Sequence, residues 1–182
     1  MKTKKPILYI DVDDTLIARD SDGEGLDGYN LRPRVVSRLR ELTKHFDCRW
    51  LTCWPEDRIK ALLYLLDASD LVRKIDYQNW KFGDGGSWGK AAAVLAGPRD
   101  FWWLEDPLPT GECLALKREG CLDRYIEVNP VGLWSFDEAF KKLNRRTGFR
   151  RNGLGRDRRG TTAGRVVQSP LTSSEQFKSR PL

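Results

Sequence analysis

The chain has 182 residues, enough for one α/β domain with a buried core but too few for two ordinary domains. Its formal net charge is +6, but ten of the 32 Lys and Arg and only two of the 26 Asp and Glu lie from Arg145 onward. The 22 basic and 24 acidic residues before Arg145 nearly cancel, so the positive charge does not describe the part of the chain that we expect to fold.

The cysteines and the apolar runs indicate the compartment. Cys48, Cys53, Cys113 and Cys121 lie in or beside apolar runs, without the dense, even spacing of a secreted disulfide scaffold. We therefore expect reduced, mostly structural thiols. The basic N-terminus is followed by an apolar run of only residues 7–10, and no apolar stretch has the length of a membrane-spanning helix. A cytoplasmic protein without a membrane partner is the expectation.

In chain order, the first elements alternate between strand and helix. The apolar, β-favouring run at 7–12 predicts a buried parallel strand. Residues 31–46 have the helical pattern, with Pro33 near the start. Residues 49–53 predict a second strand, and residues 55–66 a second helix with acidic residues in its first turn.

The same alternation continues to residue 143. We expect strands near 72–77, 101–104 and 125–128 and helices at 87–95, 112–118 and 135–143. Ser135 and Glu138 have the spacing of a capping box at the start of the last helix. Strands that alternate with helices predict an α/β fold, a three-layer Rossmann-like parallel sheet with helices on both faces.

After about Thr147 the chain becomes rich in Arg, Gly and Ser and has few large apolar residues. Such a segment buries too little surface to offset the entropy lost on ordering. We therefore expect residues 1–146 to form the domain and residues 147–182 to form a basic, disordered tail.

The candidate functional residues follow the predicted strands, because open α/β sheets bind ligands at the carboxyl ends of their strands. They are Asp11, Asp13, Asp14 and Thr15 after the first strand, Thr52 after the second, and Glu105 and Asp106 after the fourth. Lys90 stands at the start of the helix that leads into the fourth strand. The parallel sheet should bring these polar groups to one edge.

This ordered set resembles the four motifs of the haloacid dehalogenase superfamily, over roughly residues 6–143. Within that superfamily, residues 50–54 (WLTCW), 103–106 (WLED) and 129–133 (NPVGL) are similar to the small capless domain of bacterial and phage RNA-repair proteins. The resemblance implies a Mg²⁺-dependent phosphatase. The flap at about 18–30 and the segment before Lys90 are too short for a cap domain, which in this superfamily implies an open site and a large substrate such as a nucleic-acid end.

The resemblance assigns the carboxylates their roles. Asp11 would be the nucleophile that forms an aspartyl phosphate, and Asp13 the general acid and base. Asp11, the backbone carbonyl of Asp13 and an acid of the Glu105–Asp106 pair would hold Mg²⁺, which prefers oxygen ligands. The pair is Glu-Asp where the superfamily often has Asp-Asp, so Asp106 is placed ahead of Glu105.

The remaining site residues would contact the phosphate or the substrate. Thr52 would hydrogen-bond a phosphoryl oxygen, and the Lys90 ammonium would act on both the phosphate and the nucleophile. Lys81 competes with Lys90 for the lysine motif, and the spacing to Glu105 favours Lys90. Trp54 either stacks on a base of the substrate or packs in the core.

Two other phosphate-binding motifs fail on spacing. Residues 83–90 lack the glycine of a nucleotide P-loop where Asp84 stands, and Ala91 replaces its Ser or Thr. Residues 53–58 have four residues between Cys and Arg where a tyrosine-phosphatase loop has five, and two of them are acidic. His45 is the only histidine, which excludes a multi-histidine metal site.

Two hypotheses from different classes remain. The first is a phosphatase that acts on polynucleotide ends. The second is a non-catalytic binding or regulatory module, with residues 150–165 contacting a polyanionic partner. A lone Asp-x-Asp is usually a turn, and Asp13 or Asp14 alone would be read as a cap. The presence of both Asp11 and Asp13 within the ordered set favours the enzyme. These patterns leave the substrate, the role of the tail and the oligomeric state open.

Overall fold

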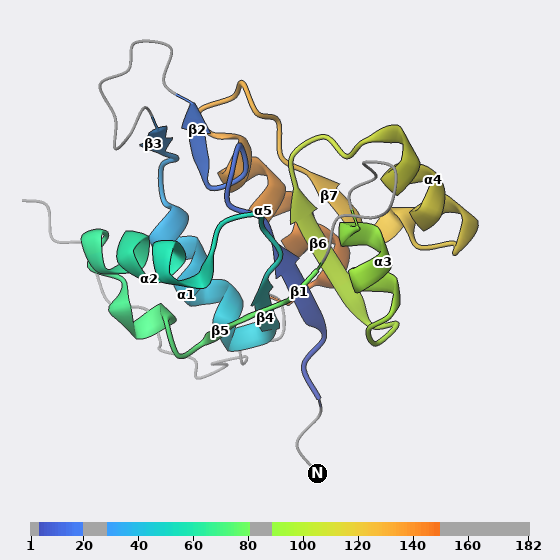
Figure 1. The fold of residues 1–182 in the computed structure, drawn as a ribbon, viewed down its shortest axis with the longest axis horizontal. Coiled ribbons are helices and arrows are strands. Elements are labelled where there is room, and N and C mark those ends of the chain that lie inside the picture. Colours follow the sequence, from blue (N-terminus) through green and yellow to red (C-terminus); the bar gives the residue numbers. More distant parts are fainter. Residues whose placement is uncertain (1–3, 20–28, 81–88, 150–182) are drawn as a thin grey trace, which may run out of the picture.

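The computed structural model describes residues 4–19, 29–80 and 89–149. The central feature of these residues is a five-stranded sheet in the order β5-β4-β1-β6-β7, in which every neighbouring pair is parallel (Figure 1). Its strands are β1 (Ile7–Ile10), β4 (Asp47–Trp50), β5 (Ile75–Tyr77), β6 (Phe101–Glu105) and β7 (Tyr125–Glu127). The sequence-based prediction of a Rossmann-like parallel sheet is confirmed.

Helices cover both faces of the sheet. One face packs against α1 (Val35–His45), α2 (Glu56–Leu65) and α5 (Ser135–Thr147), and the other against α3 (Lys90–Leu95) and α4 (Thr110–Arg118). The central strand β1 is buried on both sides because its alternate residues point to the two layers. In the part of the chain described, no helix is long and apolar enough to cross a membrane.

The chain leaves β1 in two directions from the centre of the sheet. It first builds β4 and β5 on one side and then crosses back to build β6 and β7 on the other. The strand order therefore reverses between β1 and β6, and open α/β sheets bind ligands at the carboxyl ends of the strands at such a point. The residues that follow β1 and β6 are those that the sequence singles out.

The region after β1 differs from the prediction. A two-stranded antiparallel hairpin, formed by β2 (Ile17–Arg19) and β3 (Tyr29–Leu31), lies beyond the carboxyl end of β1 (Figure 1). The predicted helix at 31–46 begins only at Val35, because Leu31 belongs to β3 and Arg34 has a left-handed φ of 63°. Residues 20–28 of the expected flap and residues 81–88 lie outside the described residues.

The capping box predicted for the last helix is wrong. The N-cap of α5 is Trp134, and no side chain caps the helix. Ser135 is already inside the first turn, where its buried hydroxyl has no hydrogen-bond partner among the described residues. Its backbone N–H instead donates to the carbonyl of Gly132 (3.1 Å), so a turn in the preceding loop replaces the side-chain cap.

The folded part extends at least to Phe149, past the boundary expected at residue 146. Gly148 ends α5 with φ of 68°, which turns the chain back onto the fold. The buried ring of Phe149 then packs against His45, Phe46 and Phe140, with ring centroids 4.8 to 5.7 Å apart. The rest of the basic tail, residues 150–182, lies outside the described residues.

Candidate active site

A cleft of about 410 Å³ opens at the carboxyl edge of β1 and β6. Among the described residues, five carboxylates and two cationic side chains line it, together with a thiol, an indole and a proline. The lining residues are Asp11, Asp13, Asp14, Cys53, Trp54, Pro55, Arg58, Lys90, Glu105 and Asp106. The structure thus gathers every site residue predicted from the sequence at this edge, and only Thr52 is not part of the lining.

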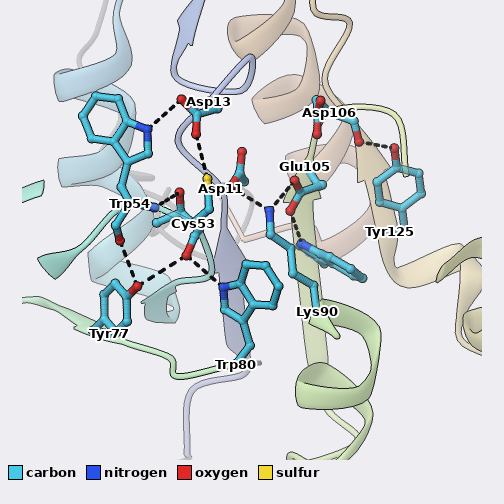
Figure 2. Close-up of polar contacts among 12 residues, drawn as sticks. Asp11, Asp13, Cys53, Trp54, Tyr77, Trp80, Lys90, Glu105, Asp106 and Tyr125 are labelled. Carbon is cyan, nitrogen blue, oxygen red and sulfur yellow. Dashed lines mark hydrogen bonds and ion pairs between the residues drawn. The ribbon is translucent and has the colours of Figure 1, made fainter. Parts of the chain in front are cut away.

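Lys90 joins the residue after β1 to the end of β6. Its Nζ donates to Asp11 Oδ1 at 2.9 Å and to Glu105 Oε1 at 2.7 Å, and all three side chains are at least 95% buried (Figure 2). Lys81, the competing lysine, lies outside the described residues. The buried ammonium therefore orients the predicted nucleophile and offsets part of the charge of two buried carboxylates.

Burial dominates the acid–base properties of this group. It raises the pKa of Asp11 to about 6, although the nearby Lys90 lowers it. It also raises the pKa of Glu105 well above its usual range, with the Asp11 charge adding to the effect. Burial lowers the pKa of Lys90, but the two carboxylates outweigh burial and the net shift is upward. At neutral pH, Asp11 is thus mostly an ionised carboxylate beside a charged lysine.

The three acids at the sheet edge form an oxygen-rich cluster. Asp11, Glu105 and Asp106 each offer a carboxylate oxygen, and these atoms lie within 4.8 Å of one another. Glu105 has both oxygens engaged, since Trp103 Nε1 donates to its Oε2 at 3.0 Å while Lys90 binds Oε1. Asp106 is only half-buried and lines the cleft. This arrangement favours Asp106 over Glu105 as a metal ligand.

The donor set fits Mg²⁺. The ligands available are hard carboxylate and carbonyl oxygens, with no histidine or thiolate in the cluster of described residues. Two cationic side chains do not balance five carboxylates, and a phosphate would add negative charge. A divalent cation among Asp11, Asp106 and Glu105 offsets this repulsion.

Asp13 is held by two residues of the loop after β4. Trp54 Nε1 donates to Asp13 Oδ1 at 2.7 Å, and Cys53 Sγ donates to Oδ2 at 3.2 Å (Figure 2). Burial and the neighbouring Asp13 raise the pKa of the Cys53 thiol to about 11. Cys53 is therefore a protonated donor at neutral pH, which agrees with the rejection of a tyrosine-phosphatase loop on sequence spacing.

Thr52 supports this loop from inside the protein. Its hydroxyl accepts a hydrogen bond from the Trp54 N–H (3.2 Å), and its carbonyl accepts one from Trp80 Nε1 (2.8 Å). Tyr77 donates from its hydroxyl to the Trp54 carbonyl at 2.8 Å. Thr52 is fully buried, so the structure shows it shaping the loop and does not place its side chain on the cleft surface.

The Trp54 ring packs within the site. Its N–H is bonded to Asp13, and the Arg58 guanidinium lies 3.8 Å from the centroid of the ring. Of the two roles considered for Trp54, the structure favours packing over stacking on a base. Arg58 was missed in the sequence analysis, although its position four residues after Trp54 in the first turns of a helix would bring the two side chains together.

Two further residues position the site and were not predicted. The buried Arg32 donates to the carbonyl oxygens of Asp14 and Pro130, each at 2.8 Å, and of Gly132. It thereby ties the loop after β1 to the loop before α5. The carboxylate of Glu112 accepts a hydrogen bond from the backbone N–H directly after Lys90. No local pattern marks either residue, because their partners are distant in the sequence.

Comparison with known proteins adds one weak similarity. No protein-family model and no curated protein matches the chain. A solved structure described as "The Structure of Fcp1, an essential RNA polymerase II CTD phosphatase" is 15% identical, with a TM-score of 0.43. The match covers 87% of this chain and 55% of that chain, so this chain spans about half the length of its structural neighbour. A similarity of this size carries no argument about function, which must come from the site itself.

Proposed function

We propose that the protein is a Mg²⁺-dependent phosphatase that works through an aspartyl phosphate on Asp11. The observation that carries the proposal is the buried Lys90 bound to both Asp11 and Glu105, with Asp106 beside them at the switch point of the sheet. A lysine holds a carboxylate ready for attack there, and hard oxygen ligands lie at the same point.

The metal would be held by Asp11 and Asp106, with Glu105 and the backbone carbonyl of Asp13 as the other candidate ligands. When bound, Mg²⁺ supplies positive charge that offsets the repulsion between the carboxylates and the phosphate. Lys90 contributes further positive charge from within the fold, and because it is buried its attraction is little weakened by solvent.

The side chains of this chain perform two steps. In the first, a carboxylate oxygen of Asp11 bonds to phosphorus while the bond from phosphorus to the leaving oxygen breaks, and Asp13 gives that oxygen a proton. In the second, Asp13 takes a proton from a water molecule that attacks phosphorus. The acyl phosphate then breaks, which releases inorganic phosphate and restores Asp11.

The substrate class that we propose is a phosphorylated nucleic-acid end. The short segments between the motifs support a site open to large molecules, and Arg58 places a cation on the cleft wall for an anionic chain. The excess of basic residues from Arg145 onward supplies charge that would attract a polyanion.

The test is Mg²⁺-dependent phosphate release from an aryl phosphate, compared between the wild type and Asp11→Asn. The variant should fold normally and lose turnover, because an amide cannot act as the nucleophile. Asp76→Asn, an exposed carboxylate on β5 outside the cleft, is the matched control and should retain activity. A folded Asp11→Asn variant with most of its activity would refute the mechanism. A wild type that releases no phosphate from aryl, alkyl or nucleic-acid esters would favour the non-catalytic module.

A further inference from the structure

The two oxygens of Asp13 have donors of different kinds. Oδ1 accepts from the indole N–H of Trp54 at 2.7 Å, and Oδ2 accepts from the thiol of Cys53 at 3.2 Å (Figure 2). An indole N–H can only donate a hydrogen bond, whereas a thiol is a weak donor and also a weak acceptor. The two sides of the carboxyl group are therefore not equivalent for carrying a proton.

We propose that Trp54 is a positioning residue that directs the transferable proton of Asp13 to Oδ2. The inference rests on the proposed function, in which Asp13 is the general acid. A proton on Oδ1 would meet the Trp54 N–H head-on and break that hydrogen bond. A proton on Oδ2 meets only the exposed Cys53 thiol, which can rotate and accept.

The surroundings hold the Trp54 indole in one place. Its backbone N–H donates to Thr52 Oγ1 at 3.2 Å, and its carbonyl accepts from the Tyr77 hydroxyl at 2.8 Å. The Arg58 guanidinium covers the ring 3.8 Å from its centroid, and the residue is 8% exposed. A donor fixed at both backbone and ring holds the carboxyl group that it contacts in one orientation.

This assignment determines the path of the proton. In the first step, the proton leaves Asp13 Oδ2 for the leaving oxygen as its bond to phosphorus breaks. In the second, the attacking water returns a proton to Oδ2 while its own oxygen bonds to phosphorus. Oδ1 remains an acceptor of the Trp54 N–H throughout, so the carboxyl group does not have to turn between the two steps.

The dependence of the rate on the leaving group distinguishes this role from a merely structural one. An alkyl oxygen is a poor leaving group and needs the proton, whereas a nitrophenolate leaves without it. Trp54→Phe should lower kcat for an alkyl phosphate by roughly ten- to a hundredfold, and kcat for p-nitrophenyl phosphate by less than about threefold. KM should stay within about twofold for both esters, because the phosphate contacts do not change.

Two further proteins control for shape and folding. Benzothienylalanine at position 54, which has sulfur in place of the indole N–H, keeps the shape of the ring and should reproduce the selective loss. Trp80→Phe removes another indole N–H, one that donates to Thr52 and not to Asp13. Any loss in that control should be equal for the two esters.

The outcomes separate the inference from the proposed function. A wild type that hydrolyses neither ester overturns both. An active wild type whose ratio of alkyl to aryl rates is unchanged by Trp54→Phe or by the sulfur analogue overturns the role of Trp54 and leaves the phosphatase intact. An unfolded Trp54→Phe protein passes the decision to the sulfur analogue, whose selective loss of the alkyl rate supports the inference and whose equal loss of both rates overturns it.

Discussion

Replacement of the buried Arg32 by methionine should destabilise the fold by about 3 kcal/mol. The guanidinium is 1% exposed and donates to the carbonyl oxygens of Asp14, Pro130 and Gly132. These hydrogen bonds connect the loop that follows the nucleophile with the loop before α5. Methionine keeps much of the apolar stem but cannot donate to any of the three oxygens.

The magnitude follows from two opposing effects. Three carbonyl oxygens lose a donor, and each loss costs roughly 1–3 kcal/mol when the group stays buried. The variant also no longer buries a charge, which relieves a penalty of several kcal/mol. Since Asp14, Pro130 and Gly132 are only partly buried, water can replace some of the lost bonds. A net loss near 3 kcal/mol results, which lowers Tm by roughly 6–12 °C for a chain of this size.

Urea unfolding followed by tryptophan fluorescence measures this change. Arg40→Met is the matched control, because Arg40 is exposed and bonds Asp70 and the Asp67 carbonyl at the surface. Its loss should stay below about 1 kcal/mol. Arg32→Lys should fall between the two, because an ammonium cannot reproduce the planar fork of the guanidinium. A free energy of unfolding for Arg32→Met within about 1 kcal/mol of the wild type would refute this account of the loop.

Three further predictions concern the metal, the tail and acid stability. Asp106→Ala should weaken the apparent affinity for Mg²⁺ in titrations of activity more than Glu105→Ala does, and the reverse order would exchange their roles. A chain that ends after Phe149 should keep its fold and its activity on aryl phosphates but bind nucleic acid more weakly, with the slope of log K against log salt reduced by roughly 0.7–0.9 for each lost phosphate contact. Superimposable binding curves would remove the tail from the functional account. Burial raises the pKa of Asp137, but hydrogen bonds from its basic partners outweigh burial and leave it below the usual range. The stability that ionised Asp137 contributes is therefore present above the ordinary carboxyl pKa and lost as the pH falls through the lowered one, so Asp137→Asn should be destabilised at neutral pH and approach the wild type in acid unfolding curves.

Local patterns along the chain were enough to predict most of the elements. The apolar run at residues 7–10 became β1, and the runs at 101–104 and 125–128 became β6 and β7. Burial on both faces requires such continuous apolar runs, so the pattern and the structure have the same cause. The hairpin of β2 and β3 was missed because three-residue strands leave too short a pattern to detect.

The capping box shows where a local pattern misleads. Ser135 and Glu138 have the right spacing, but the loop before α5 is held by Arg32 through the carbonyls of Pro130 and Gly132. The helix then begins at Trp134, one residue before the serine. A contact made 100 residues away in the chain thus outweighs the local preference of a serine for the N-cap.

The sequence by itself determined which residues reach the sheet edge, because each strand is a local run and its polar neighbour follows directly. Only the tertiary structure decided which of them touch. Lys90 reaches Asp11 across 79 residues, and Trp54 meets Asp13 across 41. Helix and strand periodicities repeat over a few residues, so they place a side chain on an element but do not specify its partner. That choice is made when the elements pack, where burial leaves a charge or an N–H stable only beside an acceptor.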